Sequence, residues 1–126
     1  MTLRYLIDAD IALYTIEGTY PALRGQVERC DPGEIGLSVI SYAEIALGSA
    51  LGKPPSPVVL ELFLRQVPIV PFEEAAARSY ARLPFKRARF DRLLAAHALS
   101  LDLTVITNNL ADFVDIPDHR VENWTL

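Results

Sequence analysis

Five acidic residues stand in or beside apolar segments of the chain: Asp8, Asp10, Glu44, Asp91 and Asp112. The first two directly follow an apolar run near the beginning of the sequence. A carboxylate that becomes buried needs a hydrogen-bond partner, an opposite charge or a metal ion. Acids spaced in this way can supply the oxygen ligands of one metal site if the fold brings them together.

The available donor types indicate which metal such a site would bind. The chain has two histidines and one cysteine, Cys30, so oxygen ligands dominate, and these suit Mg²⁺ or Mn²⁺ rather than Zn²⁺. Asn109 and Asp112 follow an apolar run that ends at Thr107, and both present oxygens. A metal held there can lower the pKa of a bound water and stabilise charge on a phosphoryl oxygen.

Each of these residues also has an ordinary structural explanation. Asp8 or Asp10 can cap the helix that follows, and we expect Asp10 to have this role. Glu44 stands three residues after Ser41, which is the spacing of a capping box. Asp91 at a helix start is stabilised by the helix dipole, and the polar residues after the last long apolar run can close an Asx turn.

Basic residues crowd the approach to Asp91: Arg78, Arg82, Lys86, Arg87, Arg89 and Arg92. A charge run of this kind is commonly a solvated face. Beside a metal–carboxylate site it also suits a polyanionic backbone, and we favour this interpretation. Arg87, Arg89 and Arg92 are the residues expected to position that backbone.

Alternating strands and helices are predicted to place these side chains. Strands are predicted at residues 3–7, 35–38, 67–72, 103–107 and near 120–122. Helices are predicted from residue 11, at 22–29, 41–51, 57–64, 73–83 and 90–101, and as a short turn within 108–113. The alternation predicts an α/β fold with a mostly parallel sheet and helices on both faces, and the prolines of 67–72 indicate an edge strand. His97 is expected to be a packed core histidine rather than a metal ligand.

Length and composition limit the class of protein. The 126 residues are the length of one domain, and the 51% hydrophobic content suits a folded core. The formal net charge of -4 argues against binding nucleic acid by bulk charge alone. Since no apolar run is long enough to span a bilayer and no signal peptide is recognisable, we expect a cytoplasmic protein.

Five segments taken together resemble the PIN-domain ribonucleases, and among them the VapC-type toxins of type II toxin–antitoxin pairs: residues 6–10, 41–45, 90–99, 105–113 and 121–124. The resemblance implies a single domain over residues 1–126, folded as a three-layer α/β/α sandwich on a mostly parallel sheet. It also implies Mg²⁺-dependent endonuclease activity on RNA, with tRNA or rRNA as the expected substrate. The implied partners are a cognate antitoxin protein and a second copy of the chain in a homodimer.

The acidic triad of this family corresponds here to Asp8, Glu44 and Asp91. Many members have a fourth acid where this chain has Asn109, and Asp112 follows three residues later. We therefore expect metal ligation by the triad and Asn109, with Asp112 in the catalytic set, and the sequence leaves open whether Asn109 or Asp112 completes the site. The family usually has Thr or Ser at the position of Ala9, and Asp10 adds a carboxylate beside it.

Two other functions remain open at this point. Asp8-Ala9-Asp10 has the D-x-D form of phosphohydrolases that use the first aspartate as a nucleophile, although no lysine obviously follows a later strand. A binding module whose carboxylates only cap helices is the alternative outside enzymology, and it predicts no stabilisation by Mg²⁺.

Overall fold

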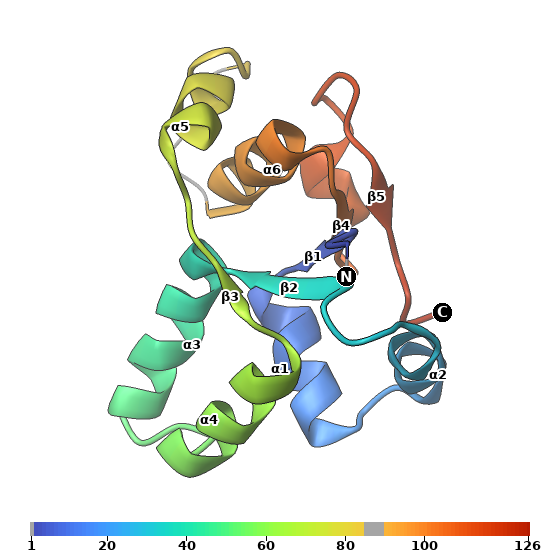
Figure 1. Cartoon of the computed structure of the whole chain (residues 1–126), viewed down its shortest axis with the longest axis vertical. Coiled ribbons are helices and arrows are strands. Elements are labelled where there is room, and N and C mark those ends of the chain that lie inside the picture. The colour runs from blue at the N-terminus through green and yellow to red at the C-terminus, as the bar shows by residue number, and fades with distance from the viewer. Residues whose placement is uncertain (1, 85–89) are drawn as a thin grey trace.

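The computed structural model describes residues 2–84 and 90–126. Within these residues, five strands form one sheet in the order β3-β2-β1-β4-β5 (Figure 1). They are β1 (Tyr5–Ile7), β2 (Ile35–Ser38), β3 (Ile69–Val70), β4 (Thr104–Ile106) and β5 (Val121–Glu122). Every pairing in this sheet is parallel, which confirms the prediction, and β3 lies at the edge as its flanking prolines indicated.

Helices cover both faces of the sheet: α1 (Ala9–Glu17), α2 (Pro21–Arg29), α3 (Val39–Ala50), α4 (Pro57–Gln66), α5 (Glu74–Ala81), α6 (Phe90–Leu101) and the short 3₁₀ helix η1 (Leu110–Phe113). In Figure 1, α1 to α4 lie on one side of the sheet and α5 and α6 on the other. Alternation in β1 explains the layering, because Ile7 packs with residues of α1 to α4 while Leu6 packs with Leu94 of α6. The α/β/α sandwich is therefore confirmed. No helix among the described residues is long and apolar enough to cross a membrane.

Two caps fix where helices begin at the carboxyl ends of the central strands. Asp8 caps α1, because its side chain accepts the backbone N–H of Ile11 at 2.8 Å. Ser38 caps α3 by accepting the N–H of Ile40 at 3.1 Å. The expectations that Asp10 caps the first helix and that Ser41 begins a capping box are wrong, since each helix starts earlier than the local spacing indicated.

His97 of α6 forms hydrogen bonds with the end of β2 and with the residue just after β3. Its ring is fully buried, with Nδ1 2.9 Å from the Ser38 hydroxyl and Nε2 2.9 Å from the carbonyl of Pro71. A carbonyl can only accept, so Nε2 carries the proton and Nδ1 accepts from Ser38. The imidazole is neutral, and burial lowers its pKa. The expectation of a packed core histidine is confirmed.

Candidate active site

Asp8 is the innermost carboxylate at the carboxyl edge of the sheet. It follows β1, its residue is 8% exposed, and it accepts hydrogen bonds from the N–H of Ile11 and the hydroxyl of Thr107. Both hydrogen bonds favour the ionised form, but burial and the nearby charge of Asp10 outweigh them and raise the pKa of Asp8. The two hydrogen bonds therefore hold the Asp8 side chain in one orientation, although burial and the charge of Asp10 disfavour its ionised form.

Glu44 extends from α3 toward the same edge. Although the residue reaches solvent, partial burial and the charges of Asp10 and Asp8 raise the pKa of its carboxyl group. Glu44 has no capping role, because α3 begins at Val39 and is capped by Ser38. Asp10 is itself exposed in the first turn of α1, so it contributes negative charge at the rim of the site.

Asp91, in the first turn of α6, brings the acids from separate elements into one electrostatic group. Burial, a hydrogen bond with Asp112 and the charges of Asp112, Asp8 and Glu44 raise the pKa of Asp91 to about 7. A carboxyl group this far from its ordinary range shares its surroundings with like charges. The charges of Asp8, Glu44 and Asp112 therefore all act on the carboxyl group of Asp91.

The segment after β4 is ordered by a short chain of hydrogen bonds. Thr107, which is fully buried, accepts the backbone N–H of Asn109 at 3.0 Å on the same hydroxyl that donates to Asp8. The side-chain amide of Asn109 donates to the carboxylate of Asp112. Asp112 thus has contacts with both Asp91 and Asn109, whereas Asn109 contacts the site through Asp112. The structure therefore favours Asp112 over Asn109 as the fourth group beside the triad.

Sequence reasoning missed the part played by Thr107. A hydroxyl residue that ends a β-branched strand and precedes two asparagines was the available signal. Its hydroxyl links Asp8 to the segment that carries Asp112, so it couples the two sides of the site.

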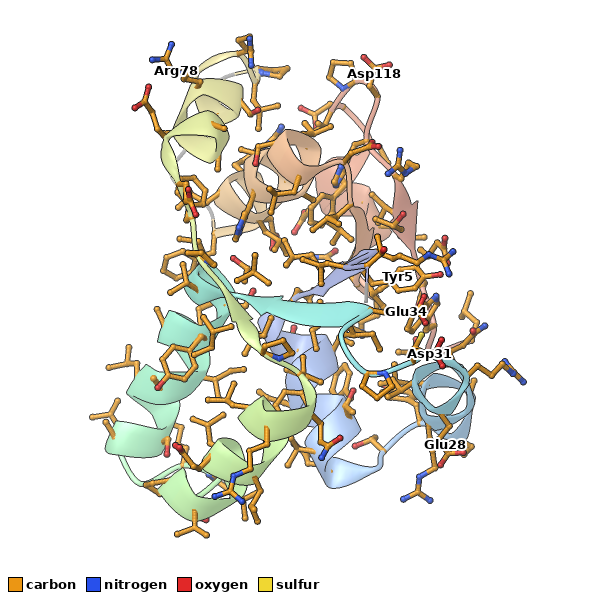
Figure 2. The ribbon with its side chains drawn as sticks, in the orientation of Figure 1. Tyr5, Glu28, Asp31, Glu34, Arg78 and Asp118 are labelled. Carbon is orange, nitrogen blue, oxygen red and sulfur yellow. The ribbon has the colours of Figure 1, made fainter. Side chains whose placement is uncertain are left out.

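Two of the basic residues expected to lie near a nucleic-acid backbone, Arg92 and Arg78, form ion pairs with acidic side chains instead. The prediction that Arg92 contacts a nucleic-acid backbone is wrong, because its side chain is 3% exposed and forms an ion pair with Asp115. Arg87 and Arg89 lie outside the described residues. Arg78 is exposed on α5, pairs with Glu74, and lies at the outer end of the molecule (Figure 2).

Acids at the opposite edge of the sheet behave differently. Figure 2 shows Tyr5, Asp31 and Glu34 where β1 and β2 begin. The N–H of Asp31 and the guanidinium of Arg4 both donate to the Glu34 carboxylate, at 2.7 and 3.1 Å, and they lower its pKa. An acid with a structural role is satisfied in this way, whereas the pKa values of Asp8, Glu44 and Asp91 are raised.

The donor set suits a hard divalent cation. Carboxylates from four elements supply only oxygen ligands, which Mg²⁺ and Mn²⁺ prefer. A bound cation would also offset the repulsion that raises the pKa values of these acids. Among residues 2–84 and 90–126, however, no three acidic, histidine or cysteine side chains are already grouped closely enough to hold one ion. Metal binding would therefore draw the side chains together.

Comparison with known proteins points to one family. The sequence model of the PIN domain matches residues 5–118. The "tRNA(fMet)-specific endonuclease VapC" of Shigella flexneri is 25% identical over 98% of this chain and 99% of its own length. "Ribonuclease VapC2" of Haemophilus influenzae is 26% identical over 97% of this chain and 98% of its own.

Two solved structures with the same fold are VapBC structures. The structure titled "Crystal structure of DNA bound VapBC from Salmonella typhimurium" has a chain with a TM-score of 0.82 and 25% identity, covering 98% of this chain and 99% of that chain. VapBC-1 from nontypeable Haemophilus influenzae has a chain with a TM-score of 0.81 and 26% identity, covering 98% of this chain and 100% of that chain.

Proposed function

The chain belongs to the PIN domain family, and from this we propose that it is a divalent-metal-dependent endoribonuclease that acts as the toxin of a toxin–antitoxin pair in the cytoplasm. The observation that carries the proposal is the mutual influence of Asp8, Glu44, Asp91 and Asp112, which come from four elements of the fold. The names of the relatives, VapC ribonucleases and tRNA endonucleases, support RNA as the substrate.

In this proposal Asp8, Glu44 and Asp91 hold one or two Mg²⁺ or Mn²⁺ ions, and Asp112 completes the set with Asn109 behind it. The bound cation supplies a lowered pKa for water and stabilises charge on a phosphoryl group. Asp8 contributes a fixed oxygen, because the N–H of Ile11 and the hydroxyl of Thr107 hold its carboxylate. Asp91 has a hydrogen bond with Asp112 and a pKa raised to about 7, so its own carboxyl group can hold a proton near neutral pH.

The two competing functions have less support. A nucleophilic Asp8 would need a carboxylate that can reach a phosphoryl group, but this residue is 8% exposed and its side chain is engaged by two donors. In a binding module without a metal site, Glu44 and Asp91 would be expected to have partners that lower their pKa values, as Arg4 and the N–H of Asp31 do for Glu34. The raised pKa values of Glu44 and Asp91 favour a site at which a bound cation would offset the repulsion between these acids.

The partner proteins follow from the relatives and from the surface. Because structures of the relatives contain VapBC assemblies, we propose that a cognate antitoxin inhibits this chain. Exposed apolar side chains on α3, at its C-cap and on α4 offer a surface for the antitoxin and for a homodimer: Leu47, Leu51, Val58 and Leu62 are 62%, 69%, 71% and 52% exposed. Light scattering of the chain with and without its antitoxin measures both associations.

The decisive experiment is cleavage of labelled total tRNA and rRNA by the purified protein. We expect discrete fragments with Mg²⁺, none with EDTA, and none from Asp91→Asn. Glu61→Gln removes one charge from an exposed position of α4 and serves as the matched control, with activity unchanged. Equal cleavage by the Asp91→Asn variant, or by the wild type in EDTA, would contradict the proposal.

A further inference from the structure

Arg92 and Asp115 form an ion pair between α6 and the residues just after η1. Nη2 of Arg92 lies 2.8 and 2.7 Å from the two carboxylate oxygens of Asp115. The Arg92 side chain is 3% exposed and that of Asp115 is 31% exposed. A guanidinium in such a position has lost nearly all of its hydration, and the ion pair with Asp115 compensates for part of that loss.

Stability alone is a poor explanation for this pair. The residues three and four positions further along α6, Ala95 and Ala96, are buried and apolar, so an apolar side chain at position 92 would suit this face of the helix. Nη1 of Arg92 is also buried, without a hydrogen-bond partner among the described residues. Replacing a buried ion pair with apolar side chains of similar volume is often neutral or stabilising in proteins. A role in orientation is the better explanation.

The pair joins the two segments that carry two of the site carboxylates. Arg92 directly follows Asp91, and Asp115 lies three residues after Asp112. Asp91 and Asp112 are close enough to form a hydrogen bond when one of them is protonated, and when both are ionised their like charges push these segments apart. The ion pair joins the same segments with an attraction of opposite charges.

We propose that Arg92 and Asp115 are positioning residues that hold Asp91 against Asp112 and so preorganise the acidic site for a divalent cation. The inference rests on the proposed function, because it assigns the pair to the same metal site. Phe113 and Ile116 also anchor this segment, since both pack in the core with residues of α6. Loss of the ion pair is therefore expected to leave the segment attached but less well oriented.

The test replaces the pair with apolar residues in Arg92→Met/Asp115→Leu. Amide hydrogen exchange in EDTA reports the order of the segment without metal, using the amides of Asp112 and Ile116, which donate to Asn109 and Phe113 at 3.2 Å. We expect both to exchange at least about tenfold faster than in the wild type, while the amide of Leu37 in β2 is unchanged. Electron paramagnetic resonance of added Mn²⁺ is expected to show about tenfold weaker binding with a melting temperature close to the wild type.

Two control variants distinguish a positioning role of the ion pair from a general effect on the structure. In Arg92→Lys the ammonium can replace Nη2, the only nitrogen of Arg92 that contacts Asp115, so Mn²⁺ affinity should stay within about threefold of the wild type. Arg78→Met/Glu74→Leu removes an exposed pair on α5 and should leave exchange and Mn²⁺ affinity unchanged. If the apolar double variant does not fold, Arg92→Lys and Asp115→Glu, which retain the charges, decide through the same two measurements.

Three outcomes would overturn the inference. They are unchanged exchange at Asp112 and Ile116 in the apolar double variant, faster exchange with unchanged Mn²⁺ affinity, and failure of Arg92→Lys to retain that affinity. A wild-type chain that binds no Mn²⁺ and cleaves no RNA would refute the proposed function instead. The exchange measurement in EDTA would still show whether the pair orders the segment.

Discussion

Removing the charge of Asp91 should stabilise the metal-free protein while it abolishes activity. Burial and the neighbouring carboxylates raise the pKa of Asp91 from 3.8 to about 7 in the folded chain. A carboxyl group with this shift binds its proton more tightly when folded, so acid favours the folded state. The stability that this group gives is lost as pH rises from 3.8 to about 7. Asp91→Asn removes the penalty at high pH because asparagine stays neutral.

The magnitude follows from the width of that interval. A shift of about three pH units corresponds to about 4 kcal/mol at 1.36 kcal/mol per unit. Asp91 is only half-buried, so solvent screening reduces this ceiling, and we expect about 2 kcal/mol. An increase of this size is large against the total stability of a small domain.

Urea denaturation in EDTA measures the effect. At pH 8 we expect Asp91→Asn to be more stable than the wild type by about 2 kcal/mol, and this difference should shrink toward zero as pH falls to about 4. Glu61→Gln removes the same charge from an exposed site and should change little. If Asp91→Asn is no more stable at pH 8, or if the difference does not depend on pH, Asp91 is not held among like charges.

Four further predictions concern the interior and the metal. Thr107→Val should lower nuclease activity about tenfold because Asp8 loses a donor, and Thr107→Ser should retain most of it, as initial cleavage rates will show. Ser38→Ala removes both a helix cap and the donor to His97, so urea denaturation should show a loss of about 1–3 kcal/mol. Burial lowers the pKa of His97 from 6.5, so the stability it gives is present above that pH and lost as pH falls below it; His97→Gln should lose less on acidification. Mg²⁺ at about 100 times its dissociation constant should stabilise the wild type by about 2.7 kcal/mol in thermal melts, and should not stabilise Asp8→Asn.

The sheet and its layers could be predicted because their signals are local. Short apolar runs separated by helical patterns are enough to indicate parallel strands, and the helix expected at 90–101 has the bounds of α6. Helix starts were harder. Ser41 and Glu44 have the spacing of a capping box, yet Ser38 caps α3, because β2 ends where Ser38 pairs with Val70 of β3. Strand pairing therefore decided a boundary that the local sequence left ambiguous.

The acids could be recognised as a set, but their individual roles could not. Asp8 caps α1 and is also one of the acids of the proposed site, so a capping role at this position does not exclude a functional one. In the sequence Arg92 resembled part of a basic strip. In the structure it is buried and pairs with Asp115, 23 residues later in the chain. No periodicity in a single sequence identifies such a pair, since its spacing follows from how α6 packs against the residues after η1.

The strand order has a consequence for the protein during its synthesis. β1 is the central strand, and the backbone N–H of Asp8 donates to the carbonyl of Ile106 in β4, which is synthesised about a hundred residues after β1. A nascent chain that ends before β4 carries Asp8, Glu44 and Asp91 but has neither Thr107 nor Asp112. One side of β1 then has no neighbour, and the acids have no common edge. The proposed site therefore cannot be complete before Thr107 and Asp112 have been synthesised and β4 has paired with β1.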